Sequence, residues 1–364
     1  MLSILTSINV FLFGLLAAFL LVREAGAKRA RYLLVAFLLT WVATLLEAVG
    51  MVEGFFVSYP RLAFWGSSLI WMQGPLIYLF TRAITKPEIT FHWRDMLHFL
   101  PGLLVLLLTQ LAYQNLPQEQ MQYVIEAAQV SASSMVIFAT LFFYVYLGFY
   151  LWQSWRLTQR YQRLLKNEYS ALEGKSLRWL YLMIGSFSGV VLITALQNVV
   201  RFYVPNFLSI AQILVFFVVL LFATRLVLQF MDHQSLAFLV EPAAAERANP
   251  AKDWTHEKKR LLTFMTEQQA YLDPDLSLAG LAERLDTDPR SLSQLINQGF
   301  EQSFFDFVNS QRIEHACQRL HSTTSKERNV TEIMYESGFN SKSSFNTAFK
   351  KFTQMTPSQY RKQG

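Results

Sequence analysis

The stretch VTEIMYESGFNSKSSFNTAFKKFTQMTPSQYR, residues 330–361, has the pattern of two short helices joined by a tight turn. Asn329 begins the first helix with a side-chain cap, and Gly338 supplies the left-handed residue of the turn. Ser341 caps the second helix, whose phenylalanines recur at the spacing of one buried face. These features together predict a helix-turn-helix. Its outward face carries polar side chains: Lys342, Ser343, Asn346 and Thr347.

An earlier copy of the same pattern occupies residues 277–297. Ser277 caps a helix with apolar residues at one buried face, and Pro289 opens the next helix, where its missing N–H is tolerated. A long amphipathic helix predicted from residue 303 to 321 would hold the two copies at a fixed separation. The outward face of the second helix of this copy carries Arg290, Ser293 and Gln294.

Composition divides the chain into an apolar part and a soluble part. Of its 364 residues, 52% are apolar, more than a soluble domain usually carries, and the excess ends near Met231. We therefore expect an all-α protein with a membrane domain at residues 1–230, a linker and connector helix at 231–272 and a soluble domain at 273–364. The single cysteine, Cys317, excludes an internal disulfide and a cysteine-rich zinc module.

Seven apolar segments approach or reach the length that a helix needs to cross about 30 Å of hydrocarbon. Basic residues are concentrated in the first, third and fifth loops between them, and such loops stay in the cytoplasm. We therefore predict seven spans, with the N-terminus outside and the soluble domain in the cytoplasm. The predicted spans are residues 2–22, 32–52, 62–84, 97–113, 130–152, 177–200 and 207–228.

Few polar residues interrupt these spans, and several lie toward the predicted outer face. Ionisable groups at membrane depth suggest a functional site, so these residues could line a ligand pocket that is open to the outside. Polar contact between helices, or anchoring at the membrane surface, is the commoner use of such residues. The pocket candidates are Glu47, Gln197, Asn198 and Arg201.

The end of the soluble domain is basic, although the domain as a whole is nearly neutral. No acidic residue follows Glu336, and a local basic face is what a phosphate backbone requires. An ordinary solvated surface would explain such a run if the helix-turn-helix pattern did not accompany it. The basic residues are Lys342, Lys350, Lys351, Arg361 and Lys362.

A connector precedes the soluble domain. Alanines and prolines at residues 240–250 indicate a spacer, and the pattern then predicts an amphipathic helix over residues 254–269. The apolar stripe of that helix could pack onto the soluble domain or form a homodimer contact.

Residues 273–362 resemble the DNA-binding domain of AraC/XylS-family transcription regulators. The shared motifs are LAERL at 281–285, RIEHACQRL at 312–320, GFNSKSSF at 338–345, FKK at 349–351 and TPSQYR at 356–361. Two departures from the family pattern are Gln354, where glycine is usual, and Met334, where alanine is common. About a quarter of the chain is covered.

The resemblance implies a bacterial protein that places two recognition helices in successive major grooves of double-stranded promoter DNA and that contacts RNA polymerase. It assigns base contacts to Arg290, Ser293, Gln294, Lys342, Ser343, Asn346 and Thr347. It assigns phosphate contact or bracing of the fold to Lys350, Lys351 and Arg361. Lys and Arg suit guanine acceptors, and Asn and Gln suit adenine edges.

We therefore expect a one-component regulator in the bacterial inner membrane that responds to an unknown signal. We expect no enzyme, no catalytic residue and no cofactor, because the chain lacks a Gly-rich phosphate loop and a nucleophile motif. His315, Cys317 and His321 have the wrong spacing for a zinc site, so no metal is expected either. A transporter, or a membrane signalling adaptor whose helix-turn-helix domain binds protein, remains the alternative.

Overall fold

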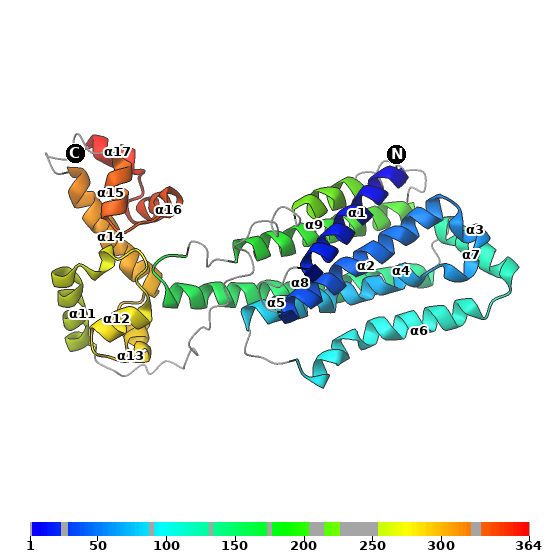
Figure 1. Ribbon diagram of the computed structural model, residues 1–364, viewed down its shortest axis with the longest axis horizontal. Helices are drawn as coiled ribbons and strands as arrows, with labels where there is room; N and C mark the ends of the chain where they lie inside the picture. Colours follow the sequence, from blue (N-terminus) through cyan, green and yellow to red (C-terminus); the bar gives the residue numbers. More distant parts are fainter. Residues whose placement is uncertain are drawn as a thin grey trace. The chain divides into compact units, whose positions relative to one another are not determined.

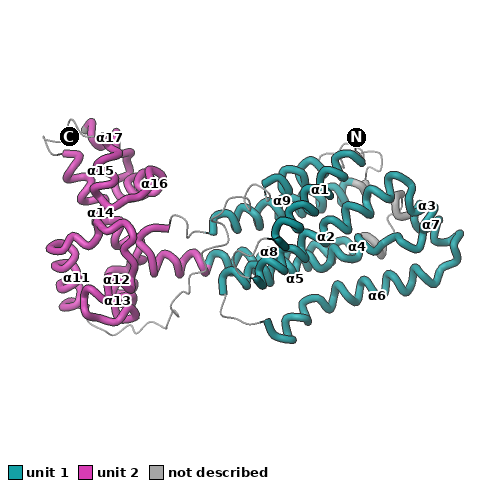
Figure 2. Tube along the Cα trace, viewed as in Figure 1, with its two compact units in different colours: residues 1–159, 177–241 teal, residues 160–176, 242–364 magenta. Residues whose placement is uncertain are grey.

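The computed structural model describes residues 2–22, 28–86, 91–130, 134–172, 177–203, 215–225, 254–321 and 329–363. The chain divides into two compact units (Figure 2). The first unit contains residues 1–159 and 177–241, and the second contains residues 160–176 and 242–364. Within the described ranges every regular element is a helix, which confirms the predicted all-α class.

The first unit is built from long apolar helices and shorter ones (Figure 1). Four helical stretches are long and apolar enough to cross a membrane: Ser3–Val22, Lys28–Val52, Trp93–Gln114 and Arg178–Val200. The elements in chain order are α1 (Leu2–Val22), α2 (Lys28–Val52), α3 (Phe55–Ser58), η1 (Pro60–Leu62), α4 (Trp65–Leu69), η2 (Ile70–Met72), α5 (Gln73–Thr85), η3 (Trp93–Phe99), α6 (Leu100–Gln114), α7 (Gln118–Val130), α8 (Ser134–Glu168), α9 (Arg178–Tyr203) and a helix at Val215–Arg225.

The structure divides the predicted span at 62–84 into several pieces. A 3₁₀ turn, η2, separates α4 from α5 just before Pro75, which has no N–H to donate to the carbonyl of Trp71. The predicted span at 130–152 lies in α8 from residue 134 onward, and only residues 215–225 of the last predicted span are described as a helix. The count of seven spans therefore stays a prediction.

Aromatic rings form the centre of the first unit. Phe13 of α1 stacks on Trp41 of α2 at 5.5 Å, and Trp41 meets Phe187 of α9 at 6.0 Å. Phe222 of the 215–225 helix stacks on Phe187 at 6.1 Å. Aromatic pairs at such distances prefer offset and edge-to-face arrangements, and here they join the first two helices of the chain to α9 and the 215–225 helix.

The second unit contains the soluble domain. Its elements are α11 (Thr255–Gln268), η5 (Ala270–Leu272), α12 (Leu278–Arg284), α13 (Pro289–Gln294), a π-helical turn η6 (Leu295–Gly299), α14 (Phe304–His321), α15 (Val330–Glu336), α16 (Lys342–Thr353) and α17 (Pro357–Gln363).

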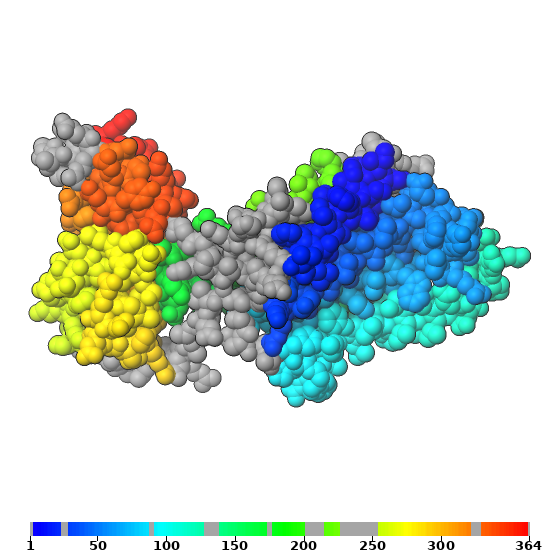
Figure 3. All heavy atoms as spheres, viewed as in Figure 1, coloured from blue at the N-terminus to red at the C-terminus, as the bar shows by residue number. Residues whose placement is uncertain are grey.

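Helix α14 carries two hydrophobic cores, one on each half. The first core includes Phe307 of α14 and residues of α11, α12 and α13. The second includes Ile313 of α14 and residues of α15 and α16. The residues around the two cores appear as the neighbouring yellow and orange lobes in Figure 3. In α11, Leu261 and Met265 are buried in the first core, so the connector helix packs onto the soluble domain.

Candidate DNA-binding site

The first helix-turn-helix consists of α12 and α13, and both helices begin at side-chain caps. Ser277 Oγ accepts a hydrogen bond from the Gly280 N–H at 3.1 Å, and Asp288 Oδ1 accepts one from the Ser291 N–H at 2.9 Å. The Ser291 contacts lower the pKa of Asp288, so its carboxylate is charged at neutral pH. The negative charge also suits the positive end of the helix dipole. The caps therefore fix where α13 begins.

The outward face of α13 holds the three residues that were predicted to contact bases. Arg290 is exposed, whereas Ser293 and Gln294 are partly buried. Asn297 Nδ2 donates to Ser293 Oγ at 3.1 Å, so the amide of Asn297 holds this hydroxyl. Asn297 itself lies in the π-helical turn that continues α13, and such turns often occur at functional sites.

The second helix-turn-helix consists of α15 and α16. Asn329 and Glu332 form the predicted capping box, and Ser341 Oγ accepts from the Ser344 N–H at 3.2 Å. Gly338 in the turn has φ +79°, and a Cβ there would lie 2.8 Å from the carbonyl oxygens of Tyr271 and Leu272. Glycine is thus required both by the backbone angle and by the close approach of this turn to the segment that precedes α12.

The polar face of α16 is open to solvent. Lys342, Ser343, Asn346 and Thr347 are all exposed, and Thr347 Oγ1 donates within the helix to the Ser343 carbonyl at 2.8 Å. Ammonium, amide and hydroxyl groups on one helix face can donate to and accept from base edges in a major groove.

The three residues that were predicted to contact phosphate or brace the fold have different surroundings. Lys350 is exposed. Lys351 Nζ lies 2.7 Å from Asp306 Oδ1 of α14, which joins α16 to the long helix. Arg361 of α17 is half-buried, and its Nε and Nη2 atoms are enclosed without a hydrogen-bond partner among the described residues. Lys351 thus has an ion-pair partner in this structure, and the role predicted for these three residues stays a prediction.

Helix α14 links the two helix-turn-helix motifs through Arg312, a residue whose role sequence reasoning missed. Its side chain is 1% exposed, and it donates to the carbonyls of Tyr271 at 2.6 Å and Asp273 at 2.7 Å. The guanidinium carbon also lies 5.6 Å from the ring centroid of Phe339, in the turn of the second helix-turn-helix. A charged residue on the buried face of an amphipathic helix is the sequence signal that could have revealed it.

Two of the residues considered for a metal site have other partners. His315 Nδ1 lies 3.2 Å from Ser337 Oγ, and burial lowers the pKa of this histidine. His321 stacks on Tyr360 at 4.6 Å between ring centroids. Burial raises the pKa of Cys317, so its thiol is protonated at neutral pH.

Of the four pocket candidates in the apolar unit, one lies on α2 and three lie on α9. Glu47 of α2 is buried, and its Oε2 accepts from the backbone N–H groups of Gly66 at 2.6 Å and Ser67 at 3.2 Å. Asn198 of α9 donates to the hydroxyl of Tyr144 at 2.8 Å. Gln197 is partly buried on the same helix, and the backbone of Arg201 continues it. Polar contact between helices thus accounts for Glu47 and Asn198 as they stand.

Comparison with known proteins agrees with this geometry. A family described as a helix-turn-helix domain matches residues 281–363. Proteins named HTH-type transcriptional regulators in Staphylococcus aureus strains COL, MSSA476 and N315 are each 37% identical over 93 residues, which is 26% of this chain and 12% of theirs. A solved protein of unknown function from Listeria innocua is 28% identical, covering 29% of this chain and 94% of its own, with a TM-score of 0.26.

The chain therefore spans about an eighth of the length of these curated relatives, and the family match lies within the soluble domain. Within that domain the predicted family is confirmed: residues 281–363 are an AraC-type helix-turn-helix domain.

Proposed function

We propose that this chain is a membrane-bound transcription regulator that binds promoter DNA through α13 and α16 and changes that binding in response to a signal sensed by its apolar unit. One observation carries the proposal. Two capped helix-turn-helix motifs pack on the two halves of α14, and each has a polar helix face outside the hydrophobic cores, exposed on α16 and partly buried on α13.

The positive charge on the polar face of α16 favours double-stranded DNA as the partner. Lys342 and Lys350 are both exposed on α16, and the amide of Asn346 lies between them in the sequence. Lysines near a duplex replace condensed counterions, so binding should weaken steeply with salt. The few amide and hydroxyl contacts would supply the choice of sequence. By family resemblance, RNA polymerase is the proposed downstream partner.

The apolar surface supports a lipid bilayer as the surroundings of the first unit. Helix α6 presents a run of exposed leucines, with exposed fractions between 43% and 61%. A contiguous apolar surface of this kind on a soluble protein would mark an interface. The leucines are Leu103, Leu104, Leu107, Leu108 and Leu111.

We place the protein in a bacterial inner membrane, with seven spans and the soluble domain in the cytoplasm. The proposed signal ligand binds near Gln197, Asn198 and Arg201 on α9, with Glu47 holding α4 against α2. Arg201→Gln should abolish the response of a target promoter, and an unchanged response would remove this pocket.

Pairing of two copies of the chain is also part of the proposal, and the mass of the detergent-solubilised protein tests it.

The direct test of the function is a genome-wide DNA footprint of the full-length protein in its membrane. The binding variant is Lys342→Ala/Asn346→Ala on α16. The matched control is Lys259→Ala/Gln268→Ala, which removes an exposed lysine and an exposed amide from α11. We expect discrete peaks for the wild type and the control and their loss in the binding variant.

Peaks that persist in the binding variant would show that α16 does not read bases. An absence of peaks in all three proteins, at matched abundance, would favour the alternative function, a membrane adaptor or transporter whose helix-turn-helix domain contacts protein. Capture of proteins by the wild type that the binding variant loses would then support that alternative.

A further inference from the structure

A segment of the apolar half of the sequence is folded with the DNA-binding domain. Residues 160–176 belong to the same compact unit as residues 242–364 (Figure 2). They contain the last turns of α8 and the chain that follows it. Because α8 is one helix from Ser134 to Glu168, it carries the chain from the first unit into the second.

Ser170 is the point of attachment. It is 1% exposed, and its N–H donates to the Leu276 carbonyl at 3.3 Å while its hydroxyl donates to the same oxygen at 2.6 Å. Next to it, Tyr169 forms an antiparallel bridge with Ser277, the residue that caps α12. The turn after α8 is therefore hydrogen-bonded to the segment that begins the first helix-turn-helix.

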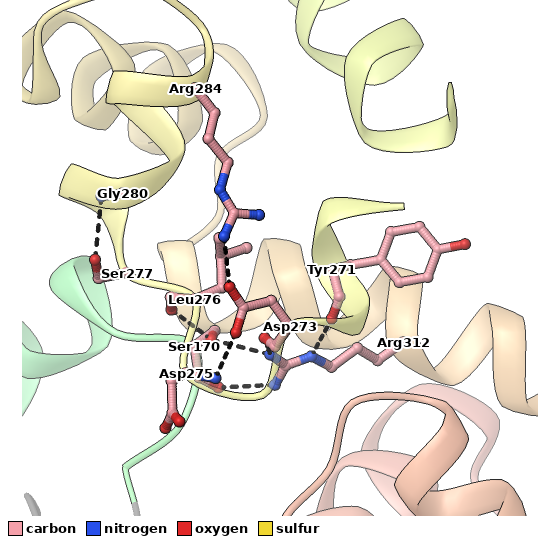
Figure 4. A network of polar contacts seen from close by, with 9 residues as sticks. All are labelled: Ser170, Tyr271, Asp273, Asp275, Leu276, Ser277, Gly280, Arg284 and Arg312. Carbon is pink, nitrogen blue, oxygen red and sulfur yellow. Dashed lines mark hydrogen bonds and ion pairs between the residues drawn. The ribbon is translucent and has the colours of Figure 1, made fainter. Parts of the chain in front are cut away.

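The same serine is also held by α14 (Figure 4). Arg312 Nη2 donates to Ser170 Oγ at 3.1 Å, and Nη1 donates to the Ser170 carbonyl at 3.4 Å. Asn309 Nδ2 donates to that carbonyl at 3.1 Å. Since Arg312 also binds the Tyr271 and Asp273 carbonyls, Ser170 lies where α14 meets the first helix-turn-helix.

The side chains of Arg312 and Asn309 on α14 form a buried polar surface that holds the turn at Ser170. Arg312 and Asn309 are each 1% exposed. If Ser170 left, each terminal nitrogen of Arg312 would lose one acceptor and would keep only Asn309 Oδ1 or the Asp273 carbonyl. Loss of acceptors from a buried charged donor is costly. The contacts are made through the backbone of the turn as well as its hydroxyl, so they recognise this turn by its shape.

We propose that Ser170 with Leu276, Asn309 and Arg312, here called the Ser170 joint, is the contact through which the apolar unit controls DNA binding. This inference rests on the proposed function. When the joint is formed, α12 is held against α14, and the two recognition helices keep the spacing that DNA requires. Displacement of Ser170 by a movement of α8 loosens that spacing and weakens DNA binding.

The proposal is tested by the affinity of the full-length protein, in lipid nanodiscs, for a duplex carrying its strongest footprint site. In Ser170→Trp the indole cannot fit at a fully buried position, so the joint should open although no residue of the helix-turn-helix domain is substituted. We expect the Kd to rise at least about fivefold, the lower end of typical couplings between sites. Ser170→Ala, which loses only the hydroxyl, should weaken binding less.

Lys166→Trp is the matched control, because it places the same side chain at an exposed position on α8, four residues before Ser170. Its affinity should stay within twofold of the wild type. A Ser170→Trp protein that binds DNA as tightly as this control, or more tightly, would overturn the proposal.

A second measurement detects the joint without DNA. Residues opposed in an antiparallel bridge have Cα atoms about 4.5–5.5 Å apart, within disulfide range. In a Cys317→Ser background, Tyr169→Cys/Ser277→Cys should therefore crosslink under mild oxidation. The duplex should raise the rate of crosslinking, since coupling between two sites is reciprocal.

The crosslinking and binding measurements distinguish a failure of the Ser170 joint from a failure of the proposed function. No crosslink in the double-cysteine variant would show that the joint is absent. A crosslink that forms, in a protein that binds no DNA specifically, would overturn the proposed function and with it the control of DNA binding, while leaving the contact itself established.

Discussion

Replacement of Gly338 by alanine should disrupt the second helix-turn-helix in a measurable way. Alanine at φ +79° costs about 1–2 kcal/mol relative to glycine. Its Cβ would also lie 2.8 Å from the carbonyl oxygens of Tyr271 and Leu272, so the turn must shift away from them. Overpacking of that kind costs about 1–3 kcal/mol, and we expect a total loss of about 2–5 kcal/mol.

Hydrogen exchange on the full-length protein in detergent measures this loss directly. Peptides covering α15 and α16 should lose protection in Gly338→Ala by the amount given above. Gly280→Ala is the matched control, because a Cβ there would meet only Ser277 Oγ, at 3.3 Å. Since Gly280 lies within α12, alanine there should leave the exchange protection of α12 equal or raise it by up to about 1 kcal/mol. Equal protection of α15 and α16 in wild type and Gly338→Ala would refute the reasoning.

The remaining predictions concern the same domain. Gln354 ends α16 at φ +62°, so Gln354→Gly should stabilise that helix by about 1 kcal/mol in the same exchange measurement. Burial lowers the pKa of His315, so the folded state binds fewer protons than the unfolded state. Stability to urea should therefore fall as the pH drops below about 6.5. His315→Gln should reduce this dependence of stability on pH. Lys350→Ala should reduce the slope of log Kd against log salt by about 0.9, whereas Lys351→Ala should leave it unchanged because Lys351 is paired with Asp306.

Local signals sufficed for the architecture of the soluble domain. Ser277 and Ser341 cap the helices that were predicted from their sequence, and Gly338 has the left-handed angle predicted for it. These features depend on neighbours only a few residues away, so a single sequence contains them. The left-handed angle of Gln354 is one that glycine, the residue expected there from the family resemblance, adopts without steric cost.

Features that depend on distant partners were not predictable. Glu47 looked like a possible ligand contact, but its carboxylate accepts from two N–H groups about twenty residues away. Ser170 lies 106 residues from Leu276 and 142 from Arg312, and serine in a polar loop gives no sign of such contacts. The π-helical turn at Leu295–Gly299 likewise follows from how the helix end packs and has no periodic signature of its own.

The position of Ser170 has a consequence for how such proteins can be recombined. The DNA-binding unit is discontinuous in the sequence, because residues 160–176 complete a fold that otherwise begins at residue 242. A chimaera that joins another N-terminal part to residue 242 onward would leave Arg312 without the acceptors that Ser170 provides. Replacement of the apolar unit would therefore have to keep the turn after α8 with the DNA-binding domain, or supply a turn of the same shape.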